Sequence, residues 1–99
     1  MLIVVQHRLT DPASAFARGE RLKRGEGAPV GTRVLQFYPS RDGDLVTCLW
    51  EGGSVAEVQR YVDDTLGDAS INVSYAVEST AAFSATPPGI ASQPTPVAA

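Results

Sequence analysis

Leu2-Ile3-Val4-Val5 and Leu45-Val46-Thr47-Cys48-Leu49-Trp50 are two runs in which apolar residues follow one another almost without a break. A strand with one face in water alternates apolar and polar residues, whereas a strand covered on both faces is continuously apolar. We therefore expect both runs to be central strands of a sheet. The chain has signals for only two helices, which usually cover one face of a small sheet. The cheapest cover for the other face is a second copy of the chain.

Around these runs the sequence predicts the order strand, helix, strand, strand, helix, strand, with strands at 2–9, 31–38, 44–51 and 71–78. The first helix should follow Thr10-Asp11, with Pro12 at its first position, and run to Lys23 or Arg24. Its expected apolar contacts are Ala13, Phe16, Ala17 and Leu22.

The second helix should begin at the capping box Ser54-Val55-Ala56-Glu57 and end at Gly67. Val55, Val58, Val62 and Leu66 form its apolar stripe, with Tyr61 beside them. This element order favours an α+β, ferredoxin-like βαββαβ fold, an antiparallel sheet of strand order 4-1-3-2 with both helices on one face. That order puts the two apolar runs in the centre. Residues 1–83 would form the domain and 84–99, rich in proline and alanine, a tail or an arm that lies on a partner.

Composition excludes several classes of function. Eight basic and eleven acidic residues give a net charge of −3, whereas nucleic-acid binding favours a basic face. One cysteine and one histidine cannot build a disulfide or a Cys/His zinc site. The apolar N-terminal stretch is far too short to span a membrane. We therefore expect a cytoplasmic protein with no cofactor, no metal, and neither nucleic acid nor membrane as partner.

The element order, the length and the apolar open face resemble the dimeric α/β-barrel superfamily. The resemblance implies two ferredoxin-like subunits pressed together around a shared cavity, as in antibiotic-biosynthesis monooxygenases and muconolactone isomerases. Val4-Val5-Gln6-His7 and Cys48-Leu49-Trp50-Glu51-Gly52-Gly53-Ser54 are similar to a narrower family of small ferredoxin-like proteins, one of them described as binding nickel. With a single histidine, this chain departs from the nickel pattern.

Three residues are the main candidates for chemistry. His7 is the default acid–base group because an imidazole titrates near neutral pH; a solvated or backbone-bonded strand-end histidine is the alternative. Gln36 and Tyr38 share one face of their strand, opposite Leu35 and Phe37, which we expect to face the helices. On the open face this amide and phenol would orient a ligand or hydrogen-bond across a subunit interface.

The remaining candidates are weaker. Trp50 and Tyr75 are ligand-binding candidates, although aromatic residues more often fill cores and interfaces. Glu51, at the end of its strand, could act as a base at a cavity mouth, whereas a solvated strand-end charge is the ordinary alternative. Cys48 is expected to act as a small hydrophobe.

These residues predict a homodimer whose facing sheets enclose a mostly apolar pocket for a small organic molecule. If the protein is an enzyme, the resemblance implies cofactor-independent oxygenation, isomerisation or cyclisation. His7 would then move protons, and Tyr38 and Gln36 would polarise a carbonyl. The alternative is a non-catalytic structural or binding dimer with a filled interface. The sequence does not decide between catalysis and binding.

Overall fold

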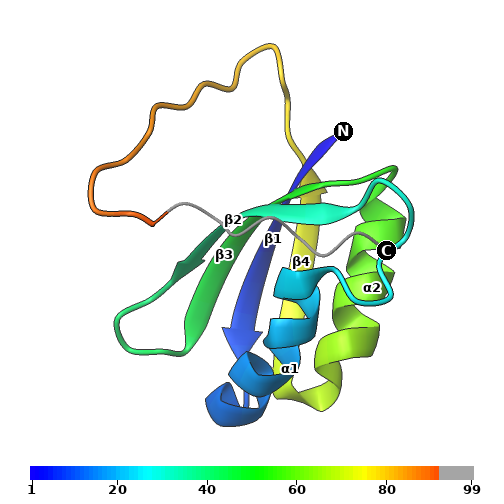
Figure 1. The fold of residues 1–99 in the computed structure, drawn as a ribbon, viewed down its shortest axis with the longest axis vertical. Coiled ribbons are helices and arrows are strands. Elements are labelled where there is room, and N and C mark those ends of the chain that lie inside the picture. The colour runs from blue at the N-terminus through cyan, green and yellow to red at the C-terminus, as the bar shows by residue number, and fades with distance from the viewer. Residues whose placement is uncertain (92–99) are drawn as a thin grey trace.

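Four strands form one antiparallel sheet, and two helices pack on one of its faces (Figure 1). The structure is a computed structural model and describes residues 1–91. Its elements are β1 (Leu2–Leu9), α1 (Pro12–Arg24), β2 (Arg33–Pro39), β3 (Leu45–Glu51), α2 (Val55–Leu66), the 3-10 turn η1 (Gly67–Ala69) and β4 (Ser70–Ala76).

The strand order is β2-β3-β1-β4, which is the predicted 4-1-3-2 counted from the other edge. The predicted ferredoxin-like α+β fold is therefore confirmed, with β1 and β3 in the centre. The second, third and fourth strands begin or end within two residues of the predicted limits.

The two helices begin and end where capping chemistry predicts. The carboxylate of Asp11 accepts hydrogen bonds from the backbone N–H and the hydroxyl of Ser14, at 3.2 and 2.9 Å, and so caps α1. Gly25 ends α1 in the left-handed conformation (φ 73°), which glycine adopts without steric cost. Ser54 caps α2 by accepting from the N–H of Glu57 at 3.1 Å.

The buried face of α1 differs from the prediction. Ala15 and Leu22 are buried, whereas Ala13 and Ala17 are exposed. Ala15, Gly19 and Leu22 are spaced four and three residues apart, so they share one face of the helix, and that face is made mostly of small side chains. The two exposed alanines are explained by their helix propensity and not by packing.

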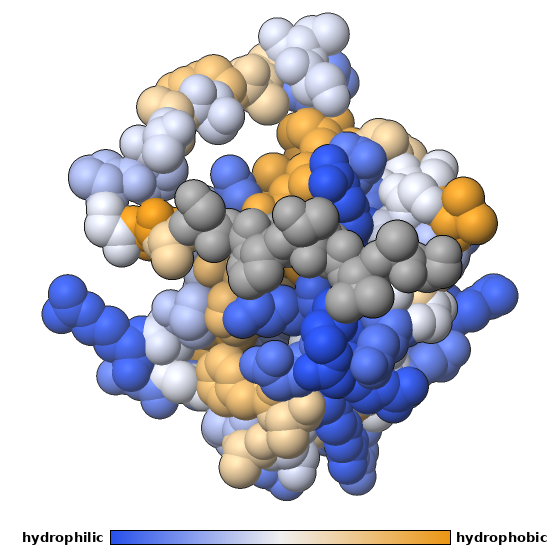
Figure 2. Space-filling view, viewed as in Figure 1, coloured by the Kyte–Doolittle hydropathy of each residue, from blue (hydrophilic) through white to orange (hydrophobic). Residues whose placement is uncertain are grey.

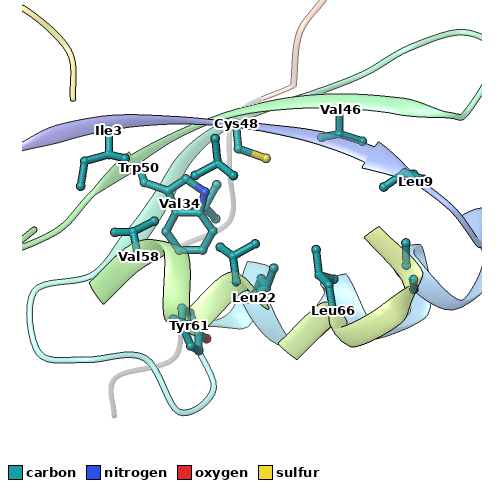
Figure 3. Close-up of a cluster of buried hydrophobic side chains, with 14 residues drawn as sticks. Ile3, Leu9, Leu22, Val34, Val46, Cys48, Trp50, Val58, Tyr61 and Leu66 are labelled. Carbon is teal, nitrogen blue, oxygen red and sulfur yellow. The ribbon is translucent and has the colours of Figure 1, made fainter. Parts of the chain in front are cut away.

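Trp50 of β3 is the largest fully buried side chain. Its ring meets that of Tyr61 edge to face, with centroids 6.0 Å apart, and Val58 and Ile3 pack in the same cluster beneath the sheet (Figure 3). The tryptophan joins the central strand to α2 in one core. Trp50 therefore belongs to the helix side of the sheet and not to the open face.

In β4 the polar residues face the helices and the apolar residues face outward, which is the reverse of the usual arrangement. Ser70, Asn72 and Ser74 lie on the helix side, whereas Ile71, Val73 and Tyr75 lie on the open side, with 48%, 59% and 50% of their surface exposed. The pairing of Asn72 with His7 and of Val73 with Gln6 fixes this register. A slip by one residue would exchange the two sets.

A bulge in β2 changes which side chains face the helices. Val34 pairs with Trp50 and Gln36 with Leu49, so Leu35 is the additional residue. Phe37 lies on the helix side, where its ring meets that of Phe16 edge to face at 6.4 Å. The prediction that Phe37 would face the helices is thus confirmed, and Val34 faces them as well, because the bulge at Leu35 shifts the alternation.

The segment after β4 leaves the sheet, arches away from the body and returns on the side of β2 and β3 (Figures 1 and 2). Residues 84–91 line a pocket there. Residues 92–99, which complete the predicted tail or arm, lie outside the described part of the chain.

Trp50→Ala should lower the free energy of unfolding by about 3–5 kcal/mol, because it removes the largest side chain of the core and leaves a cavity. Val30→Ala is the control, since Val30 is fully exposed and its truncation should change stability by no more than about 0.5 kcal/mol. Urea unfolding of both variants at one protein concentration measures the difference. Equal effects would contradict the assignment of Trp50 to the core.

Candidate functional site

A pocket of about 770 Å³ lies between α1, the β2–β3 half of the sheet and the returning C-terminal segment. Its walls are mostly apolar. They include Leu9, Ala15, Phe16, Leu22, Val34, Phe37, Val46, Cys48, Trp50, Leu66, Pro87 and Ile90. The small face of α1 explains the space, because Gly19 lies on the pocket wall and a side-chain carbon added there would meet no atom within 4 Å.

This pocket is at the β2 edge and is bounded by α1, on the helix side of the sheet. The sequence predicted a pocket on the open face instead. A cavity between two facing sheets needs a second chain and stays a prediction. The volume falls within the range of small-molecule sites, about 300–1,000 Å³.

His7 is buried on the helix side of the sheet and lines this pocket. Its Nδ1 lies 2.7 Å from Oδ1 of Asn72 on the neighbouring strand β4. Asn72 in turn donates from Nδ2 to Oδ1 of Asp63 in α2, at 2.8 Å. Neither the solvated nor the backbone-bonded alternative describes this imidazole, which is held by a side-chain network.

The network has two more members. Ser70 Oγ donates to Oδ1 of Asn72 at 2.6 Å, and Gln59 Nε2 lies 3.0 Å from each carboxylate oxygen of Asp63. Gln59 also donates to the backbone carbonyl of Asn72 at 2.9 Å. Asn72 is therefore fixed from β4 and from α2, and it fixes His7.

Burial lowers the pKa of His7 below its ordinary value of 6.5, and the hydrogen bond to Asn72 and the charge of Asp63 oppose this shift only in part. At neutral pH the imidazole is therefore uncharged. Burial also raises the pKa of the Cys48 thiol to about 12, so this pocket residue is an unreactive thiol and not a nucleophile.

The indole of Trp50 is a second polar group at the pocket. Its Nε1 is buried and has no hydrogen-bond partner within the described residues. Buried donors without a partner are rare in proteins, so this N–H needs an explanation. Figure 3 shows the indole nitrogen on the sheet side of the ring, away from Tyr61.

The other predicted site residues lie elsewhere on the sheet. Gln36 and Tyr38 pair with Leu49 and Thr47 on the open side, although both also contribute to the pocket at the β2 edge. His7 thus reaches the pocket from one side of the sheet, and these two reach it from the other.

Tyr75 and Glu51 stand on the open side. Tyr75 pairs with Val4 in the strand register, half exposed and outside the described pocket. The carboxylate of Glu51 is 3.8 Å from the guanidinium of Arg33 on β2, so this glutamate is engaged in a cross-strand ion pair.

Asn72 and Asp63 were not among the candidates from sequence. The available signal was the alternation of 71–78, which puts Asn72 and Ser74 on one face. That alternation does not say which face meets the helices. It also gives no hint that a strand carboxamide and a carboxylate of α2 converge on the histidine of β1.

Three arginines of α1 are paired with acidic groups. Arg18 lies 3.1 Å from Asp68, and Arg21 and Arg24 lie 3.7 and 3.2 Å from Glu26. Among residues 1–91, no three histidine, cysteine, aspartate or glutamate side chains gather as a metal site would require. Neither helix of the described chain has the length and apolar character that crossing a bilayer demands.

Comparisons with known proteins give no relative: no family model, no curated protein and no solved structure matches this chain. The class that the coordinates define is a ferredoxin-like α+β domain with an apolar, histidine-containing pocket under its helices.

The buried histidine makes stability depend on pH. Because the pKa of His7 is lowered by folding, the unfolded chain takes up a proton below pH 6.5 that the folded chain does not. Stability should therefore fall as the pH drops through 6.5, and the loss should continue down to the lowered pKa. Urea midpoints over this range measure the slope.

His7→Gln is the matched variant, since its amide can still donate to Asn72 but has no proton to gain. Its stability should change less over the same range. An unchanged slope in the variant would assign the effect to other groups.

Proposed function

We propose that the protein binds a small, mostly apolar organic molecule in the pocket between α1 and the β2–β3 half of the sheet. The observation that carries the proposal is a cavity of about 770 Å³ whose walls are mostly apolar and include the imidazole of His7. Binding sites for small molecules combine a concave apolar lining with a few polar groups that set orientation.

We further propose that two copies pair through the open faces of their sheets, in the manner of the dimeric α/β barrels. The support comes from β4, which turns Ile71, Val73 and Tyr75 outward while its polar residues face the helices. Val4 and Leu49 lie on the same side, on the two central strands. Contiguous exposed apolar surface on a small protein usually marks an interaction site.

A second copy of this chain is the occupant that fits best. On the open side, the central strands β1 and β3 carry the apolar residues Leu2, Val4, Leu45 and Leu49. Sheet-on-sheet packing would cover these residues at once. Polar residues of the same two strands, among them Gln6, Arg8 and Thr47, share this face, and interfaces commonly mix apolar and polar groups in this way.

Filling the pocket tests the binding proposal. Gly19→Leu should project a side chain into the cavity and lower the affinity for a neutral apolar fluorescent dye at least tenfold, since the added atoms occupy the ligand's place. The same change should stabilise α1 by about 1 kcal/mol, because leucine is a better helix former than glycine. Ala17→Leu, on the exposed side of the helix, is the control.

Dye titration and thermal unfolding of the three proteins give the answer. Failure of the wild-type protein to bind, or equal affinity in all three, would refute the pocket as the binding site.

A charge on the exposed apolar side of the edge strand β4 tests the dimer. The wild-type chain should sediment as a dimer at micromolar concentration, and Val73→Lys should sediment as a monomer, because a lysine cannot be buried between two apolar sheets without a partner. Val30→Lys, at a fully exposed loop valine, should remain dimeric. A wild-type monomer at this concentration would refute the dimer.

A further inference from the structure

The hydrogen-bond network around His7 determines which ring nitrogen carries the proton. The carboxylate of Asp63 can only accept, so the amide nitrogen of Asn72 must face it, and the amide oxygen must therefore face His7. That oxygen is 2.7 Å from Nδ1 and also accepts from Ser70. Since an amide oxygen cannot donate, Nδ1 carries the hydrogen.

An uncharged imidazole has one N–H and one lone pair, so Nε2 of His7 is a hydrogen-bond acceptor. No described residue makes a hydrogen bond to this nitrogen. The ring is held on its Nδ1 side by β4, which turns Nε2 away from β4. His7 lines the pocket, and so does Val46, its pairing partner on the adjacent strand β3.

The surroundings of Nε2 favour a ligand that donates a hydrogen bond to it. Cys48 on β3 and Leu9 on β1 offer the pocket no strong donor, and Glu20 and Lys23 of α1 are the charged residues that line it. Asn72 contacts the imidazole, and Asp63 places a negative charge behind Asn72. An N–H or O–H donor brought by a ligand would therefore meet a hydrogen-bond acceptor whose orientation is fixed by Asn72 and Asp63.

We propose that the pocket takes an aromatic or enolic hydroxyl compound whose O–H donates to Nε2 of His7, with Asn72 and Asp63 as positioning residues. This inference rests on the proposed binding function and names the ligand class for it. The arrangement thus suits binding of a hydroxyl group that keeps its proton.

Two probes of nearly equal size separate the inference from the binding function. With the full-length protein, 2-naphthol should bind roughly two- to twelvefold more tightly than 2-methylnaphthalene, which is the net contribution of one buried hydrogen bond. His7→Phe should remove this preference while 2-methylnaphthalene still binds. Equal affinities in the wild-type protein would overturn the inference and leave the pocket as a binding site; binding of neither probe would overturn both.

The tautomer supplies a readout that does not depend on affinity. His7 is the only histidine, so long-range ¹H–¹⁵N spectra of the labelled protein report on this ring alone. Nδ1 should resonate as a protonated nitrogen and Nε2 as an unprotonated one, and 2-naphthol should shift Nε2. Protonation of Nε2 in the free protein at neutral pH would overturn the inference.

Asn72→Ala tests the positioning role, also in case His7→Phe fails to fold. The variant should give a mixture of tautomers and lose most of the preference for 2-naphthol, with unchanged affinity for 2-methylnaphthalene. Ser74→Ala is the matched control, two residues along the same face of β4, with a hydroxyl that has no described partner. A preference that survives in Asn72→Ala, or that falls equally in Ser74→Ala, would overturn the role of the network.

Discussion

The pairing of β4 with β1 fixes which side chains of β4 meet the helices. Asn72 stands opposite His7 on the helix side, so the apolar residues Ile71, Val73 and Tyr75 have to face outward. One register therefore produces both a polar network around a buried histidine and an exposed apolar surface. The cost of exposing that surface is offset if a second copy covers it, which links the proposed dimer to the proposed site.

The pocket depends on a second feature, the small side chains on the inner face of α1. Ala15 and Gly19 do not fill the space between this helix and the β2–β3 half of the sheet, whereas Val58 and Val62 of α2 pack tightly under β1 and β3. This space beside the dense core is the one to which the proposed binding function is assigned. Trp50 lies between the packed core under α2 and the pocket beside α1.

Polar groups inside this half are few and differ in reactivity. Cys48 is held as a thiol by burial, and the imidazole of His7 is uncharged and oriented by Asn72. The same desolvation suppresses the nucleophile and keeps the base in its neutral form. The chemistry that this pocket can support is therefore acceptance of a hydrogen bond, and not covalent attack by sulfur.

The sequence determined the fold because its signals are local. Continuous apolar runs, the caps at Asp11 and Ser54, and the period of α2 each follow from neighbours along the chain, and together they leave one topology. The site was decided by contacts across long separations, such as His7 with Asn72 and Asn72 with Asp63. Alternation in a strand defines two faces but not which one meets the helices, and a single bulge in β2 reverses the pattern. Only the tertiary structure could therefore put the histidine under the helices, whereas the open-side position of Gln36 and Tyr38 was predicted from the sequence.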